Sequence, residues 1–205
     1  VGNNALRLNV TGASNVAVGS SALDANLASN NTAVGKSALA ANTTGANNVS
    51  VGTASLDANT TASNNVAVGV NTLGVNTTGA NNTAIGHEAL DANTTAANNT
   101  AVGYNSLKAN TTGTTNVAIG QDALAQNTTA ANNVAVGALA LYANTTAAYN
   151  TAVGSGALAA ATTGANNIAM GYLAGNDITT GEYNVALGTY ALDANTTASY
   201  NVAVG

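Results

Sequence analysis

The chain has 205 residues, of which 5% are charged and 3% are aromatic, with no Phe, Trp or Cys, and its formal net charge is -5. This composition excludes a core of large aromatic rings, disulfide bonds and thiolate metal sites. It also argues against nucleic-acid binding, because Arg7, Lys36 and Lys108 are the only basic residues and phosphate recognition needs many cations.

No apolar run is long enough to cross a membrane. The longest, Val134 to Ala143, is about half of the roughly 20 residues that a span needs, and it contains Gly137. No initiator Met or basic leader opens the chain, which begins with Val1-Gly2 and ends on Gly205. We therefore expect a segment of a longer repetitive polypeptide, with no membrane contact of its own.

The stretch Asn-Val-Ala-Val-Gly, first complete at Asn15 to Gly19, returns every 17 residues, apart from one step of 16 between Gly19 and Gly35. Such a period predicts one elongated body that grows by stacking short coils. We therefore treat residues 1–205 as a single repetitive solenoid segment. Its coils end at Gly19, Gly35, Gly52, Gly69, Gly86, Gly103, Gly120, Gly137, Gly154, Gly171, Gly188 and Gly205.

Each unit contains one short strand followed by turns. The triplet Val16 to Val18 alternates large and small residues, is β-branched, and is bounded by Asn and Gly, which is typical of a strand between turns. No stretch between Gly19 and Gly35 offers the roughly 10 to 12 periodic residues of a helix. The sequence predicts an all-β fold, a parallel β-solenoid of about twelve 17-residue coils spaced by about 4.8 Å.

Two apolar columns are expected to form the interior. The residue before each repeated Gly is always apolar, from Val18 to Val204, and the fourth residue after it is Leu except at Gly175. The repeated Gly predicts a positive φ or a close approach between coils. The repeated Asn, first at Asn15, predicts an amide ladder that satisfies polar groups at the bend.

The middle residue of each strand is Ala in all coils but one, where it is Ser50. If the flanking valines point inward, pleat alternation turns this residue outward. A solvated position would accept Lys or Glu, so we interpret the column as a packed outer face that contacts a partner chain; the alternative is that Ala faces a narrow interior. The expected contact residues are Ala17, Ala33, Ala67, Ala84, Ala101, Ala118, Ala135, Ala152, Ala169 and Ala186.

Asn-Thr-Thr recurs once in most coils and matches the pattern for N-glycosylation. Turn formation explains the same residues, because Asn and Thr bond nearby backbone groups. The possible acceptors are Asn42, Asn59, Asn76, Asn93, Asn110, Asn127, Asn144 and Asn195. The stacked Thr rows also raise ice binding as a less favoured function, although only one Thr of each pair can join a given surface.

The sequence offers no basis for catalysis. His87, the only histidine, lies beside Glu88 at variable positions that read as exposed, and no nucleophile has a base at a meaningful spacing. Aspartates such as Asp57 and Asp91 recur at two-coil spacing, too far apart for one Ca²⁺. The seven tyrosines all lie in the second half, where they could contact a sugar or protein or be neutral drift. We expect no catalytic, cofactor or metal site, and no enzyme.

The full unit, as in residues 99–113, resembles the repeats of phage tail-fibre and bacterial tail-fibre-domain proteins, and Asn82 to Gly86 resembles the head repeats of trimeric autotransporter adhesins. The resemblance covers the whole chain. It implies a left-handed β-roll, three chains side by side, and attachment outside a cell or on a virion. The 16-residue coil and the coil from Tyr172 to Tyr183 depart from the pattern.

From these observations we expect a stiff structural and adhesive segment, the shaft or head of a surface adhesin or phage tail fibre. Its partners would be copies of itself, as a homotrimer, and a cell-surface receptor or glycan. The alternative is a self-assembling extracellular filament subunit. The expected locations are extracellular, at the cell surface or on a virion.

Overall fold

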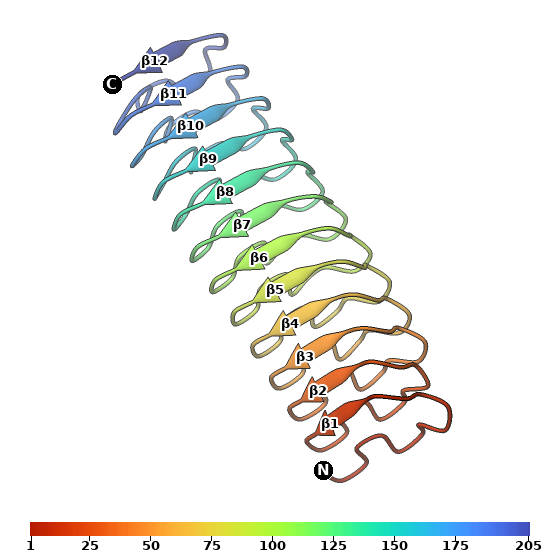
Figure 1. Cartoon of the computed structure of the whole chain (residues 1–205). Helices are drawn as coiled ribbons and strands as arrows, with labels where there is room; N and C mark the ends of the chain where they lie inside the picture. The colour runs from red at the N-terminus through yellow and green to blue at the C-terminus, as the bar shows by residue number, and fades with distance from the viewer.

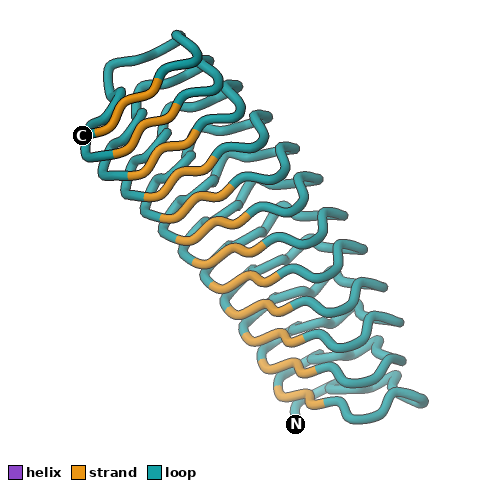
Figure 2. The backbone as a smooth tube through the Cα atoms, turned by 45° about the horizontal axis from the view of Figure 1, so that its top comes forward, coloured by secondary structure: helices purple, strands orange, loops and turns teal.

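The computed structural model describes residues 1–205 as one elongated stack of coils, with the two termini at opposite ends (Figure 1). Each coil contributes one three-residue strand, and all strands lie along the same face of the stack (Figure 2). The strands are β1 (Val16–Val18), β2 (Thr32–Val34), β3 (Val49–Val51), β4 (Val66–Val68), β5 (Thr83–Ile85), β6 (Thr100–Val102), β7 (Val117–Ile119), β8 (Val134–Val136), β9 (Thr151–Val153), β10 (Ile168–Met170), β11 (Val185–Leu187) and β12 (Val202–Val204).

The strands form a single parallel sheet of 12 strands in sequence order, so about 11 turns separate β1 from β12. Equivalent residues pair throughout, for example Ala101 with Ala118. The chain contains no helix, and hence none that could cross a membrane. The prediction of an all-β parallel solenoid with 17-residue coils is confirmed.

The interior is built from the predicted Leu column and two columns of Ala. Leu23, Leu39 and their equivalents through Leu158 are fully buried. The residue before each Leu, as at Ala89, and the middle residue of each strand, as at Ala101, are buried beside it. Most coils therefore enclose one Leu between two small side chains, and this apolar core is continuous only because coils stack.

The prediction that the strand valines point inward is wrong. The strand side chains alternate in the opposite sense: the middle residue is buried, and the first and third residues are partly or fully exposed. The reason is space. The Leu from the opposite wall fills the narrow interior, and only a methyl group, or the hydroxyl of Ser50, fits against it. Ser50 donates to the carbonyl oxygen of Ser55 at 2.8 Å, so this buried hydroxyl is satisfied.

Backbone conformation explains why the column is Leu. Leu107 has a φ of 51° and its equivalents are similar, which is the left-handed region. Val and Ile are disfavoured there because of their branched Cβ. The repeated Gly is constrained in two ways, as predicted: Gly103 has a φ of 135°, and a Cβ on it would collide with the carbonyl oxygen of Gly120. Hence this position excludes any side chain.

Two columns of Asn bind successive coils together. Asn48 belongs to the column before the strands; its Oδ1 accepts the backbone N–H of Asn65 at 2.9 Å, and its Nδ2 donates to the carbonyl oxygen of Ala62 at 2.9 Å. These bonds run mainly to backbone rather than between amides, so the predicted ladder exists here in a modified form.

The true amide ladder is formed by the Asn of Asn-Thr-Thr. In this Asn ladder each Nδ2 donates to the Oδ1 one coil earlier, at distances from 2.7 Å between Asn42 and Asn26 to 3.3 Å between Asn26 and Asn9. Each Nδ2 also donates to a carbonyl oxygen three residues further on, except in Asn26, where it is two. The members are Asn9, Asn26, Asn42, Asn59, Asn76, Asn93, Asn110, Asn127 and Asn144.

Candidate binding surfaces

The most extensive apolar surface lies on the sheet. The first and third residues of all twelve strands point outward and form a strip that we call the apolar sheet face. Val16 is 50% exposed, Ile85 40% and Met170 44%. No charged residue interrupts the strip, and Thr32, Thr83, Thr100 and Thr151 are its only polar members. At about 4.8 Å per coil it is roughly 53 Å long.

The expected partner contacts at the middle of the strands are therefore corrected. These alanines are buried within their own coil, where they contact the Leu column and cannot reach another chain. The correction applies to Ala17, Ala33, Ala67, Ala84, Ala101, Ala118, Ala135, Ala152, Ala169 and Ala186, none of which is more than 8% exposed. The constant small residue reflects a narrow interior, which was the alternative interpretation.

The proposed glycosylation acceptors are also corrected, with one exception. Asn42, Asn59, Asn76, Asn93, Asn110, Asn127 and Asn144 are fully buried in the Asn ladder. Both hydrogens of each Nδ2 are donated to protein acceptors, as in Asn59 to Asn42 Oδ1 at 2.8 Å and to Ala62 at 3.0 Å. A sugar cannot be attached to these nitrogens in the folded chain. Asn195, in the last coil, is only half-buried.

The threonine pairs divide between two environments. The first hydroxyl of each pair is half-buried and donates to the carbonyl oxygen of its equivalent in the next coil, as Thr43 does to Thr60 at 2.9 Å. The second Thr, such as Thr44, is exposed. The expectation that one Thr per pair joins a surface is confirmed, and the exposed row is a single file rather than a flat two-dimensional array.

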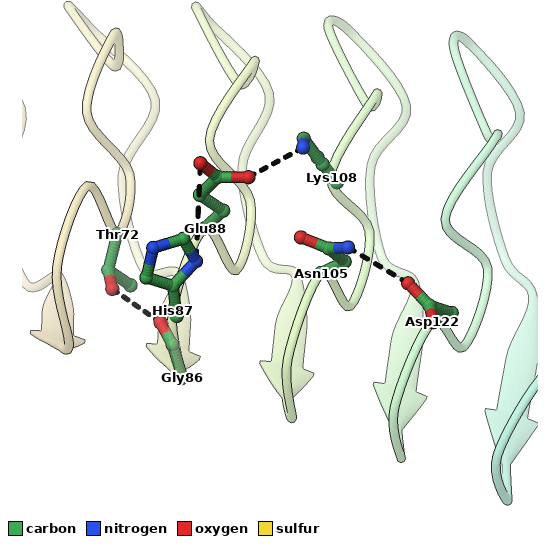
Figure 3. Close-up of polar contacts among 7 residues, drawn as sticks. All are labelled: Thr72, Gly86, His87, Glu88, Asn105, Lys108 and Asp122. Carbon is green, nitrogen blue, oxygen red and sulfur yellow. Dashed lines mark hydrogen bonds and ion pairs between the residues drawn. The ribbon is translucent and has the colours of Figure 1, made fainter.

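Most of the ionic side chains in the middle of the chain gather on three successive coils (Figure 3). Lys108 Nζ contacts Glu88 Oε2 at 2.5 Å, and His87 Nδ1 lies 4.0 Å from the other oxygen of Glu88. The hydrogen bond from Lys108 lowers the pKa of Glu88 and raises that of Lys108. The His87 ring stacks on Tyr104 with centroids 5.6 Å apart. The Lys108–Glu88 ion pair lies at the surface, so it contributes little to the stability of the fold.

A groove adjoins this group on the wall that follows the repeated Gly. Its volume is about 360 Å³, and it spans four coils. Asp91 is partly desolvated there, which raises the pKa of its carboxyl group. Asn105 Nδ2 donates to Asp122 Oδ1 at 3.0 Å, while Asn105 Oδ1 is enclosed and has no partner. The groove is lined by Asp91, Ala92, Asn105, Lys108, Ala109, Asp122, Ala125, Gln126 and Tyr142.

Sequence reasoning missed this groove, although a signal for it existed. Aligning the units by 17 residues places Asp91 and Lys108 at one position, and Asn105 and Asp122 at another. The two positions flank the Leu, and their side chains leave the coil on the same side. What the alignment does not give is the width of the gap between them.

No three His, Cys, Asp or Glu side chains are placed to hold a metal ion. The tyrosines form short exposed stacks in the last coils: Tyr183 lies parallel to Tyr200 at 5.1 Å, and Tyr172 meets Tyr190 edge to face at 5.5 Å.

Comparisons of the chain with protein families, with curated proteins and with solved structures find no match.

Proposed function

We propose that this chain is a stiff segment of an extracellular or virion-borne attachment fibre, and that copies of it assemble through the apolar sheet face. One observation carries the proposal: the strip has no charged residue from β1 to β12 and is apolar except for four threonines, whereas monomeric proteins rarely expose a contiguous apolar patch of more than a few hundred Å². Burying the strip against a second copy removes it from water.

The chemistry of the strip favours a copy of the same chain as its partner. Its Val, Ile, Thr and Met side chains repeat at the coil spacing, so two parallel copies present matching rows at about 4.8 Å. A charged partner would find no counter-charge on this face. The resemblance to tail-fibre and adhesin repeats supports three chains and left-handed coils, and it supports the outside of a cell or virion as the location.

Coil-to-coil bonding supports the mechanical part of the proposal. The chain makes 134 backbone hydrogen bonds, most of them between neighbouring coils, and the Asn columns add side-chain bonds in the same direction. A stack held at every turn resists bending and offers no long free loop. This suits a spacer that holds an attachment site away from a surface.

Light scattering after size exclusion tests the assembly. We expect a mass three times that of the 19.7 kDa chain. Val68→Lys combined with Val102→Lys places charges on the apolar sheet face and should give a monomer, whereas Thr112→Lys, on the exposed Thr row, should leave the mass unchanged. A wild-type monomer would refute assembly through this face. A mass that grows with concentration would instead favour the filament alternative.

Ice binding is not proposed. The exposed Thr residues form one row, and the hydroxyls beside them are already bonded to carbonyl oxygens of the next coil.

A further inference from the structure

The 360 Å³ groove has the size of a ligand site and follows the axis of the stack. Its lining comes from four successive coils, from Asp91 to Tyr142, so it extends roughly 14 Å along the axis at about 4.8 Å per coil. It shares no residue with the apolar sheet face. A ligand in it would lie along the fibre and would leave that face free.

Hydrogen-bond acceptors in the groove lack donors. Asn105 Oδ1 has no partner but is fully enclosed, so a ligand in the groove cannot reach it, and the amide is held by its bond to Asp122. The Asp91 carboxylate receives no side-chain hydrogen bond and is half-buried. A partly buried acceptor without a donor is unfavourable, and a ligand that donates a hydrogen bond to Asp91 would recover part of this cost.

Donors and a ring complete the lining. Lys108 is anchored by Glu88 (Figure 3) and keeps further N–H groups for a ligand. Gln126 lies near the Tyr142 hydroxyl, and the Tyr142 side chain is 37% exposed at one end of the groove. Ala92, Ala109 and Ala125 give a floor of small side chains. A ligand is therefore met by acceptors, donors, methyl groups and an aromatic ring within a short distance.

Two other ligand classes fit less well. An extended peptide that adds a strand needs free backbone groups, but Ala92 N–H donates to Lys108 and Ala109 N–H to Ala125, both at 3.0 Å. A strongly charged ligand of either sign would meet a like charge, because Lys108 and Asp91 line the same groove. Neutral hydroxyl groups donate and accept at once, and they match both kinds of lining group.

We propose that this groove binds a neutral saccharide chain lying along the fibre axis, with the Asp91 carboxylate accepting hydrogen bonds from its hydroxyl groups and Tyr142 packing against a sugar ring. The site deepens the attachment role proposed above, on which it rests for its biological purpose. Its geometry does not depend on assembly.

A smaller hollow at the same positions near the C-terminus supports a longitudinal groove as a property of the coil. It has a volume of about 120 Å³ and is lined by Leu173, Asn176, Asp177, Tyr190, Asp193 and Ala194. The bulkier Leu173 and Tyr190 occupy the positions that Asn105 and Asp122 hold in the larger groove.

The repeat supplies variants that should fold. Ala109→Leu fills the groove, and Leu8 and Val75 already occupy this position elsewhere in the chain. Asp91→Ala with Asn105→Ala removes the accessible acceptor and the amide that lines the groove beside it, and Ala40 and Ala54 are the natural precedents. Ala41→Leu makes the same change as Ala109→Leu at the same position of a distant coil and serves as the control.

The test uses the whole chain on an array of neutral linear oligosaccharides, with the best ligand measured by calorimetry. We expect saccharide binding that is lost in Ala109→Leu, weakened at least about tenfold by the double Ala variant, and unchanged in Ala41→Leu. Absence of binding to every member of the array, or equal binding by Ala109→Leu, would overturn the proposal. Masses measured on the same samples report assembly separately, so either proposal can fail alone.

Discussion

The coils from Asn26 to Asn144 and the coils from Ala161 to Ile178 solve the same packing problem in different ways. In the first region each coil buries one Leu and one Asn of the Asn ladder. In the second, Ala161 replaces Asn, and in the next coil Gly175 and Ile178 replace Leu and Asn. Ile178 is fully buried, and its Cδ1 lies 3.0 Å from where a Cβ on Gly175 would be.

The difference shows what the coil conserves. The large apolar side chain has moved from one wall to the other, so the interior of the coil stays filled although neither consensus residue is present. The polar ladder does not survive this exchange. Asn144 Oδ1, which would accept from an Asn at position 161, is buried without a partner. A large apolar side chain from either wall can thus fill the interior, whereas a hydrogen bond between two Asn side chains requires the partner Asn at one particular position.

The largest effect is expected from Gly175→Leu, which restores the consensus residue while Ile178 remains. Backbone strain is not the obstacle, because the Leu column adopts a similar φ. The new side chain would overlap Ile178 and Leu158, and overpacking of this kind costs about 1–3 kcal/mol. The urea midpoint should fall. Adding Ile178→Asn should bring it back; a single variant as stable as the wild type would contradict exchange of volume between the walls.

Removing one ladder amide should cost more inside the ladder than at its end. Asn93→Ala leaves Asn76 Oδ1 without a donor and takes an acceptor from Asn110, whereas Asn144→Ala affects only Asn127 in this way. We expect a loss of about 2 kcal/mol for Asn93→Ala and about 1 kcal/mol less for Asn144→Ala. Chemical denaturation of the two variants gives the comparison. Equal losses would mean that the bonds between amides contribute nothing beyond packing.

Making the two regions alike should stabilise the chain slightly. The triple variant Ala161→Asn, Gly175→Leu and Ile178→Asn extends the ladder from Asn144 to Asn195, and each added hydrogen bond contributes about 1 kcal/mol or less. Ala161→Asn alone is the control, because it only moves the unpaired Oδ1 one coil further. A gain in thermal midpoint for the triple variant and none for the control is expected; the reverse would contradict the role of the ladder.

The smallest expected effect is a pH-dependent change in thermal stability when a partly buried Asp of the regular region is replaced. Desolvation raises the pKa of Asp57 and of Asp91 above the usual value for an Asp carboxyl group, so folding favours their protonated forms. Their stabilising contribution is present below about pH 4 and is lost as pH rises through the folded pKa. Asp57→Asn should therefore raise the thermal midpoint at pH 7, by about 1 °C, and leave it unchanged near pH 3. Asp24→Asn, which breaks the ion pair with Arg7, should give no gain.

The sequence was sufficient to predict the solenoid, its period and the Leu column, because each rests on a spacing that no other fold explains. It did not determine which way the strands face. In a Val-Ala-Val triplet either the two valines or the alanine can face the core. Which of them does depends on the distance between the two walls of the coil. That distance is set by the Leu at φ near 50° and by the Asn columns, and neither is visible as a width in the sequence.

The same limit explains the candidate sites. The partner-contact alanines were predicted from their constancy, and the acceptor asparagines from the match of Asn-Thr-Thr to the glycosylation pattern. Both sets belong to repeated columns that are buried against the next coil. The groove was missed for the opposite reason. Asp91, Asn105 and Lys108 occupy variable positions, and only stacking brings residues that are 17 apart in sequence to within hydrogen-bonding reach of one molecule.

The one short coil has a consequence for how such a chain can change its length. Between Gly19 and Gly35 a single Leu27 stands where most other coils have two threonines, yet β1 and β2 still pair in register. The coil is one residue shorter in this exposed turn, so the deletion does not shift the strands or the interior columns. Duplication or loss of a whole coil would leave every interior column aligned and alter only the reach of the molecule, by about 4.8 Å each time. The coil is therefore a unit of length that evolution can add or remove without redesigning the core.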